Sequence, residues 1–235
     1  MFADASCLNR RRYTEDITLY CEVMDKQIYI LGIGHNTPVF MDLALDCGYY
    51  IAGLYHYNDE RTGEMDYGYK VLGSFNDLFQ QDICQKNFLL TMGDIQIRKT
   101  LCGQLLKSGG KIPTLIHPTA VISRFAQIDA CGVLINAFSH IQANTVIEEN
   151  VTILSEVIVS HNNVVGAYSF LADKAFVGAY THVGKNVFFG QGALSISGKV
   201  ADIGDGAYIG AASLLTKNVP SEAVVCGQPA RVIRY

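Results

Sequence analysis

The second half of the chain repeats an aliphatic residue every six positions, and this period restricts the folds open to it. With two small insertions the repeat runs from Ile116 to Leu215, and only Ser195 breaks the series of large apolar residues. The residue two places earlier is small or β-branched, with Asn163 as the departure. A period of six fits neither the 3.6-residue period of an α-helix nor the two-residue alternation of a strand.

Such a unit is best explained as one flat face of a coil, with three faces making a turn of about 18 residues. The aliphatic side chains would fill the prism, and the small residues would lie where neighbouring strands crowd. Glycines that follow the aliphatic residue would relieve the corners: Gly166, Gly178, Gly184, Gly190, Gly204 and Gly210. A β-sandwich is the alternative, but its turns would not keep a fixed six-residue frame over this length. We expect an all-β parallel β-helix with a C-terminal cap over residues 113–235.

The preceding residues follow a different pattern. Strand-like runs at 28–31, 50–55 and 88–91 alternate with helix-like segments at 37–47 and 94–107, which predicts βαβ units around a parallel sheet. Thr37 is the expected N-cap of the first helix, with Pro38 at its first position, and Asp94 is expected to open the second. Gly48 and Gly109-Gly110 are the expected stops. We therefore expect an α/β, Rossmann-like domain over residues 24–112.

Composition excludes several classes of function. The formal net charge of -4 comes without any dense Lys or Arg run, so neither nucleic acid nor an anionic membrane is an expected partner. Seven scattered cysteines without a C-x-x-C spacing favour a reducing cytoplasm over a disulfide framework. No apolar run is long enough for a membrane span. Residues 1–23 have little periodicity, and we expect them to be an extension upstream of a natural start at Met24.

Five segments carry a resemblance to a known family. They are residues 28–35 (IYILGIGH), 92–98 (MGDIQIR), 115–123 (LIHPTAVIS), 160–166 (SHNNVVG) and 226–231 (CGQPAR). Together with the six-residue repeat, they resemble the hexapeptide-repeat sugar acetyltransferases typified by bacillosamine N-acetyltransferase and sialic acid O-acetyltransferase. The resemblance implies a left-handed β-helix, a homotrimer, acetyl-CoA as co-substrate and a nucleotide-linked sugar as acceptor, with the amino or hydroxyl group to be acetylated left open.

Acetyl transfer needs a base for the acceptor's proton and a donor for the oxyanion of the tetrahedral intermediate. His161, two places after the inward Val159, is expected to point outward, and it matches the family's catalytic histidine. Relatives usually place an acid directly after it, whereas this chain has Asn162, which can orient the imidazole but stabilises its charged form less well. Relatives often carry a second histidine nine residues later, where this chain has Phe170.

A turn of 18 residues places Ala179 directly over His161. Its backbone N–H is the expected oxyanion donor, in a slot where relatives often have glycine. Acetyl-CoA is expected along the outside of the coil between two subunits, at Gly178, Ala179, Gly190, Gly210, Ala211, Lys217 and Arg231. The alternative is that the glycines are plain corner residues and the two cations solvated charges.

The N-terminal domain is expected to bind the nucleotide. The loop Gly32, Gly34 and His35 precedes a helix and could cradle a phosphate. Tyr55 could stack on a base or sugar, and the resemblance adds Gly93, Asp94 and Arg98. The alternatives are that Tyr55 is an ordinary loop aromatic, and that the segment of Gly93, Asp94 and Arg98 supplies only a helix cap and a surface charge. NAD is not expected, because no acid ends the second strand.

His140, His161 and His182 are spaced by 21 residues, and this even spacing suggests a zinc site. Since 21 is not a multiple of 18, the three rings within one chain would point in different directions, and no metal is expected. The sequence thus predicts a cytoplasmic, homotrimeric acetyltransferase with His161 as general base. Two other classes stay open: a non-catalytic sugar-nucleotide-binding or assembly module, and a metal-dependent hydratase.

Overall fold

The computed structural model describes residues 26–235, so the expected extension 1–23 and the start at Met24 lie outside the described residues. The described chain divides into two compact units, residues 26–92 with 100–111, and residues 93–99 with 112–235. No helix within residues 26–235 is long and apolar enough to cross a lipid bilayer.

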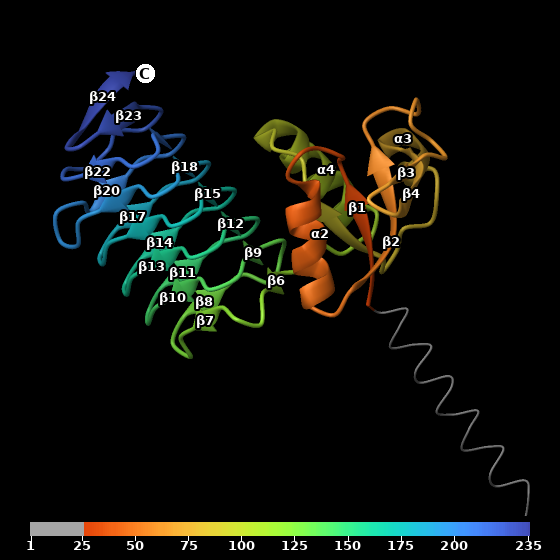
Figure 1. Ribbon diagram of the computed structural model, residues 1–235, viewed down its shortest axis with the longest axis horizontal. Coiled ribbons are helices and arrows are strands. Elements are labelled where there is room, and N and C mark those ends of the chain that lie inside the picture. Colours follow the sequence, from red (N-terminus) through yellow and green to blue (C-terminus); the bar gives the residue numbers. More distant parts are fainter. Residues whose placement is uncertain (1–25) are drawn as a thin grey trace, which may run out of the picture. The chain divides into compact units, whose positions relative to one another are not determined.

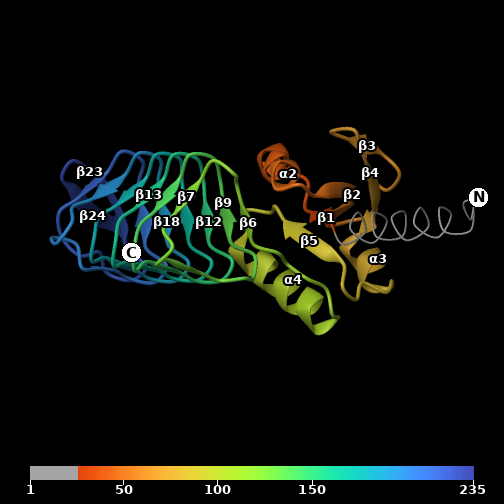
Figure 2. The same ribbon diagram turned by 90° about the horizontal axis from the view of Figure 1, so that it is seen from below.

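The first unit is a five-stranded sheet with helices on both faces. Its order is β3-β4-β2-β1-β5, and β3 alone runs antiparallel to its neighbour. Figure 2 shows α2 on one face and α3 and α4 on the other. The strands are β1 (Gln27–Leu31), β2 (Tyr50–His56), β3 (Met65–Asp66), β4 (Tyr69–Ser74) and β5 (Asn87–Leu90), and the helices are α2 (Thr37–Asp46), α3 (Phe75–Phe79) and α4 (Ile95–Lys107).

The expected strands and helices of this unit are all present as β1, β2, β5, α2 and α4, but three further elements were not predicted. Strands β3 and β4 and helix α3 lie between β2 and β5. A capping box marks the start of α3, because Ser74 and Asp77 exchange side-chain and backbone hydrogen bonds. The expected N-cap of α2 is wrong. Asn36 holds that position, and Thr37 is buried, with its hydroxyl accepting from the Gly34 N–H at 2.9 Å.

The second unit is a coil of two-residue strands in three parallel sheets (Figure 1). Sheet I holds β6 (Leu115–Ile116), β9 (Leu134–Ile135), β12 (Thr152–Ile153), β15 (Phe170–Leu171), β18 (Phe188–Phe189), β21 (Tyr208–Ile209), β23 (Val224–Gly227) and the antiparallel β24 (Ala230–Arg234). Sheet II holds β7 (Val121–Ile122), β10 (His140–Ile141), β13 (Ile158–Val159), β16 (Phe176–Val177), β19 (Leu194–Ser195) and β22 (Leu214–Leu215). Sheet III holds β8 (Gln127–Ile128), β11 (Val146–Ile147), β14 (Val164–Val165), β17 (His182–Val183) and β20 (Asp202–Ile203).

Strand register confirms the 18-residue turn. Ile158 pairs with Phe176, and Val164 pairs with His182, each 18 residues along the chain. The offset grows to 20 between His182 and Asp202, because the corner from β19 to β20 is two residues longer than its counterparts. The aliphatic series is buried from Ile135 to Leu215 and partly exposed at its first three members, Ile116, Ile122 and Ile128.

The corners differ from the expectation in the position of the left-handed residue and in the reason for the glycines. The left-handed residue stands three places after the aliphatic one, as at Asn162 and Tyr180 with φ of 59° and 63°. Glycine is needed directly after these aliphatic residues because the backbone of the next turn approaches closely there. A Cβ on Gly166 would lie 2.6 Å from the Gly184 carbonyl carbon, and one on Gly178 2.5 Å from the Ser195 oxygen.

The small hydroxyl residues that precede the aliphatic positions also form hydrogen bonds between turns. Ser139, Thr145 and Ser169 are buried, and each donates to a corner carbonyl 15 residues further on, at 2.8, 2.7 and 2.8 Å. These bonds satisfy carbonyls that the short strands leave without a ladder partner.

Candidate active site

His161 stands at the corner between sheets II and III, directly after β13. The side chain is partly exposed, and its Nδ1 lies 2.9 Å from Asn162 Oδ1. The ring of Tyr180, one turn higher, meets the imidazole edge to face, with centroids 5.2 Å apart. Packing on one side and a hydrogen bond on the other hold the ring in one orientation.

The hydrogen bond to Asn162 also selects the tautomer. An amide oxygen only accepts, so Nδ1 donates this hydrogen bond, and in the neutral ring the lone pair is then on Nε2. An imidazole with a free Nε2 and an oriented ring is equipped to take a proton from an attacking group.

Ala179 lies on the turn directly above His161, as the register requires. The residue is 4% exposed, and its backbone N–H donates to Ser197 Oγ at 2.9 Å. Asn163 is buried and ties the two turns together. Its Oδ1 accepts from the Thr181 N–H at 2.7 Å, and its Nδ2 donates to the Ser160 carbonyl at 2.9 Å. Sequence analysis marked Asn163 as a departure from the repeat but did not single out Ser197.

The residues expected to contact acetyl-CoA fall along two edges of the coil. Gly178, Ala179 and Lys217 follow strands of sheet II and share the corner of His161. Gly190, Gly210 and Ala211 follow strands of sheet I, and a Cβ on Gly190 would lie 2.7 Å from the Ala211 nitrogen. Arg231 is exposed on β24 at the C-terminal end of sheet I.

The three evenly spaced histidines do not converge. His140 lies on sheet II, His182 on sheet III, and His161 at the corner between these sheets. Within residues 26–235, no group of three His, Cys, Asp or Glu residues could hold a metal ion. His182 instead pairs with a carboxylate, its Nδ1 lying 2.9 Å from Asp202 Oδ1, with both side chains about half exposed.

In the first unit, the loop of Gly32, Gly34 and His35 leads from β1 into α2. Gly32 has a φ of 95°, and its carbonyl accepts from the Thr91 hydroxyl at 2.8 Å. Gly34 and His35 are exposed at the helix N-terminus. Hydroxyl groups thus hold this loop in shape beside a helix end that favours anions.

Tyr55 and Tyr57 differ sharply in exposure. Tyr55 is 2% exposed and packs near Tyr29, with ring centroids 6.2 Å apart, and burial raises the pKa of its phenol. Tyr57 is 68% exposed. The ring available for stacking at the end of β2 is therefore that of Tyr57, and the buried Tyr55 cannot present its face to a ligand.

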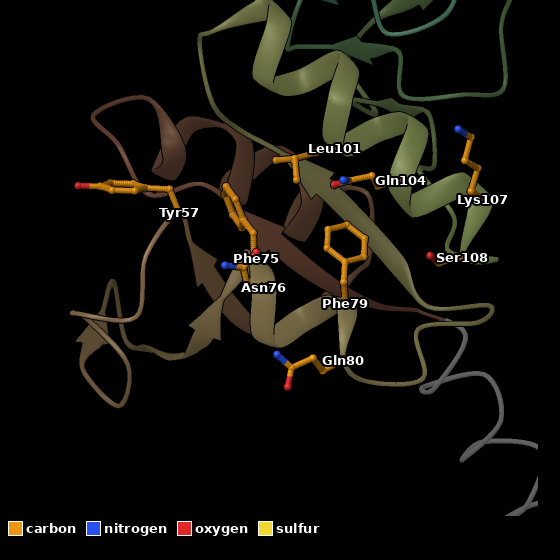
Figure 3. Close-up of a pocket in the computed structure, with 9 residues that line it drawn as sticks. All are labelled: Tyr57, Phe75, Asn76, Phe79, Gln80, Leu101, Gln104, Lys107 and Ser108. Atoms are coloured by element: carbon orange, nitrogen blue, oxygen red, sulfur yellow. The ribbon is translucent and has the colours of Figure 1, made fainter.

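Tyr57 also lines a pocket of about 820 Å³ in the first unit. Figure 3 shows the Phe75 and Phe79 rings directed from α3 towards α4, where Leu101 and Gln104 face them. Lys107 and three other polar residues, Asn76, Gln80 and Ser108, complete the lining. Sequence reasoning missed this pocket because it missed α3, although the capping motif at Ser74 and Asp77 could have revealed the helix.

Gly93, Asp94 and Arg98 belong to the second unit at the start of α4. Gly93 and Asp94 are exposed, and Asp94 Oδ1 accepts from the backbone N–H groups of Gln96 and Ile97 at 2.8 and 2.9 Å, as a helix cap does. Arg98 is 7% exposed and donates to the Asn150 carbonyl at 3.2 Å, so it is not a surface charge.

Sequence comparison finds acetyltransferases among the relatives of this chain. No protein-family model matches the sequence. The chain is 29% identical over 180 residues to the GDP-perosamine N-acetyltransferase of Escherichia coli O157:H7, covering 75% of this chain and 80% of that protein. Over 120 residues it is 35% identical to the serine acetyltransferase of Buchnera aphidicola, covering 50% of this chain and 37% of that one.

Solved structures match most of the described chain. The acetyltransferase domain of PglB from Neisseria gonorrhoeae, in complex with acetyl coenzyme A, superposes with a TM-score of 0.79 at 26% identity, covering 88% of this chain and 99% of that one. PerB from Caulobacter crescentus, in complex with CoA and GDP-perosamine, has a TM-score of 0.70 at 24% identity, covering 88% and 97%. The second likeness shows a shared fold.

Proposed function

We propose that this protein transfers the acetyl group of acetyl-CoA to the amino group of a nucleotide-linked sugar. The proposal rests on its homology to the hexapeptide-repeat sugar acetyltransferases. The coil is then the left-handed β-helix of these enzymes, and the first unit a Rossmann-like nucleotide-binding domain. The chain is an acyltransferase that uses acetyl-CoA as co-substrate.

His161 is the general base in this proposal. The amine attacks the thioester carbonyl carbon while Nε2 takes its proton, and a tetrahedral intermediate forms with its negative charge on the former carbonyl oxygen. Collapse of that intermediate breaks the carbon–sulfur bond, and the CoA thiolate leaves and takes the proton from the imidazolium. The observation that carries the proposal is the hydrogen bond between His161 Nδ1 and Asn162 Oδ1, which places the lone pair of the neutral ring on Nε2 of a partly exposed side chain.

The two edges of the coil that carry the expected acetyl-CoA residues support a homotrimer. The edge of Gly178, Ala179 and Lys217 and the edge of Gly190, Gly210, Ala211 and Arg231 lie on different corners of one chain. A threefold assembly would set one edge of each subunit against the other edge of its neighbour. Each acetyl-CoA would then lie between two chains, with Asn162 orienting the base.

The first unit binds the nucleotide of the acceptor in this proposal. Gly32, Gly34 and His35 would receive a phosphate at the start of α2, and Tyr57 would stack on a base or sugar in place of the buried Tyr55. Asp94 caps α4 and Arg98 is buried, so of the second segment only the exposed Gly93 would present its backbone to the ligand.

Turnover assays with UDP-, GDP-, dTDP- and CMP-linked amino sugars, with free CoA followed by a thiol reagent, test the proposal. We expect turnover with one nucleotide class, and His161→Ala to lower it on the order of 10²-fold or more. His182→Ala is the matched control, because His182 is also exposed on the coil and has its own carboxylate partner. Loss of activity in His182→Ala with near-normal activity in His161→Ala would reject the assignment.

A non-catalytic module on the same scaffold is the second candidate. It is favoured by Asn162, which supplies no negative charge to an imidazolium. Binding of a sugar nucleotide detected by thermal stabilisation, without CoA release from any acceptor, would select it.

A further inference from the structure

At the corner above His161, each of four successive backbone N–H groups already has an acceptor. The N–H groups of residues 178, 179, 180 and 181 donate at 2.8, 2.9, 3.3 and 2.7 Å to, in that order, Ser195 Oγ, Ser197 Oγ, the His161 carbonyl and Asn163 Oδ1. The Ala179 N–H proposed as oxyanion donor is thus occupied by a serine hydroxyl.

The two serine acceptors differ in where they stand. Ser195 is 0% exposed, at the inward position of β19 that elsewhere holds a large aliphatic side chain. Ser197 is exposed, on the corner that carries two additional residues. That corner is the next one above Ala179, and Ser197 Oγ reaches down to the Ala179 N–H at 2.9 Å.

The direction of this hydrogen bond decides what the hydroxyl can do. Because the N–H donates, Ser197 Oγ is an acceptor, and its own proton remains to be donated. Among residues 26–235 this hydroxyl donates no hydrogen bond, and the Ser197 side chain is exposed, so a ligand outside the coil can accept from it. A hydroxyl held by an N–H in this way is oriented before any ligand arrives, which is what stabilisation of a developing charge requires.

We infer that the Ser197 hydroxyl donates the hydrogen bond to the oxyanion and that the Ala179 N–H positions this hydroxyl. The inference rests on the proposed acetyl transfer at His161 and adds a catalytic residue to it. As the amine nitrogen bonds to the thioester carbon, the carbonyl π electrons move onto the oxygen, and the Ser197 O–H donates to that oxygen. When the electrons return and the carbon–sulfur bond breaks, the hydrogen bond weakens and the serine keeps its proton.

Ser197→Ala and Ser197→Thr, assayed beside the parent enzyme, test the inference. We expect Ser197→Ala to lower kcat by about 10²-fold or more, the range found when one oxyanion donor is removed. The KM for acetyl-CoA should change little, because the bond strengthens only as charge develops. Ser197→Thr keeps a hydroxyl and should restore most of the turnover.

Ser123→Ala is the matched control. Ser123 lies on the same corner column two turns below His161, and its hydroxyl accepts from the Phe125 N–H at 3.2 Å. Normal or raised kcat in Ser197→Ala would overturn the inference, since the hydroxyl would then only block the Ala179 N–H. If His161→Ala abolishes turnover in the same series, the proposed function survives that result. A parent enzyme without turnover would instead reject both.

Discussion

At His161 the partner that orients the ring is an amide. Asn162 Oδ1 accepts from Nδ1 at 2.9 Å, but it would bring no negative charge to the imidazolium of the proposed proton transfer. Asn162 also occupies the left-handed region with φ of 59°, which Asn and Asp tolerate better than other side chains. An aspartate could therefore replace it with the backbone unchanged.

Asn162→Asp should make the enzyme faster and shift its pH dependence. The carboxylate keeps the acceptor for Nδ1 and favours the protonated ring, so kcat should rise severalfold, and the acid limb of the pH–rate profile should move to higher pH. Steady-state rates across pH 5–9 measure both effects. A lower kcat with an unmoved acid limb would contradict the role given to Asn162.

Asn163 is the departure from the small or β-branched residues that precede the aliphatic positions, and it stabilises the turn below the candidate oxyanion site. Replacing it with Val restores that pattern but leaves the Thr181 N–H without its 2.7 Å acceptor. We expect a loss of about 1–3 kcal/mol in the free energy of unfolding, the cost of one unsatisfied buried donor. Denaturant titration of Asn163→Val measures it, and a variant as stable as the parent would show that the amide is not needed for stability.

Among the elements, the repeat predicted the coil correctly because one six-residue rule decides both burial and register. The first unit was predicted less completely. Helix α3 has only five residues, and the apolar residues of strand β4 follow no long period, so only the capping motif at Ser74 marks this part of the chain. The sequence pointed to His161 and Asn162, whose roles stay predictions, but it did not single out Ser197, because the proposed role of Ser197 depends on a corner whose length the repeat does not set.

The corner glycines give a test at this scale. A Cβ on Gly190 would lie 2.6 Å from the Ile209 carbonyl oxygen, so Gly190→Ala should destabilise the coil by about 1–3 kcal/mol. Gly192→Asn is the matched control, because Gly192 has a φ of 62° with open space around it, and asparagine holds the equivalent place at Asn162. Thermal melts compare the two, and an equal loss of stability would show that conformation, not contact, requires Gly190.

The whole molecule is expected to assemble through an outward face of the coil. Phe170, Phe188 and Tyr208 form a stacked aromatic column on sheet I, with centroid separations of 5.5 and 4.6 Å. Three 25.7-kDa chains, about 77 kDa together, should sediment as one species. Phe188→Glu should shift that species to monomers by placing a charge in the column.

Val121→Glu serves as the matched control for that experiment. Val121 is 57% exposed on sheet II, away from the aromatic column. A trimer that withstands Phe188→Glu but dissociates on Val121→Glu would place the subunit contact on the other face.

The order of strands in sheet II also predicts the order in which the coil unfolds on heating. Each turn of the coil touches only the turns above and below it, so such a stack melts inward from its two ends. Strand β13, which leads into His161, has two strands on one side and three on the other. Fraying must therefore consume whole outer turns before it reaches the imidazole, and acetyl transfer should outlast the first loss of ordered structure.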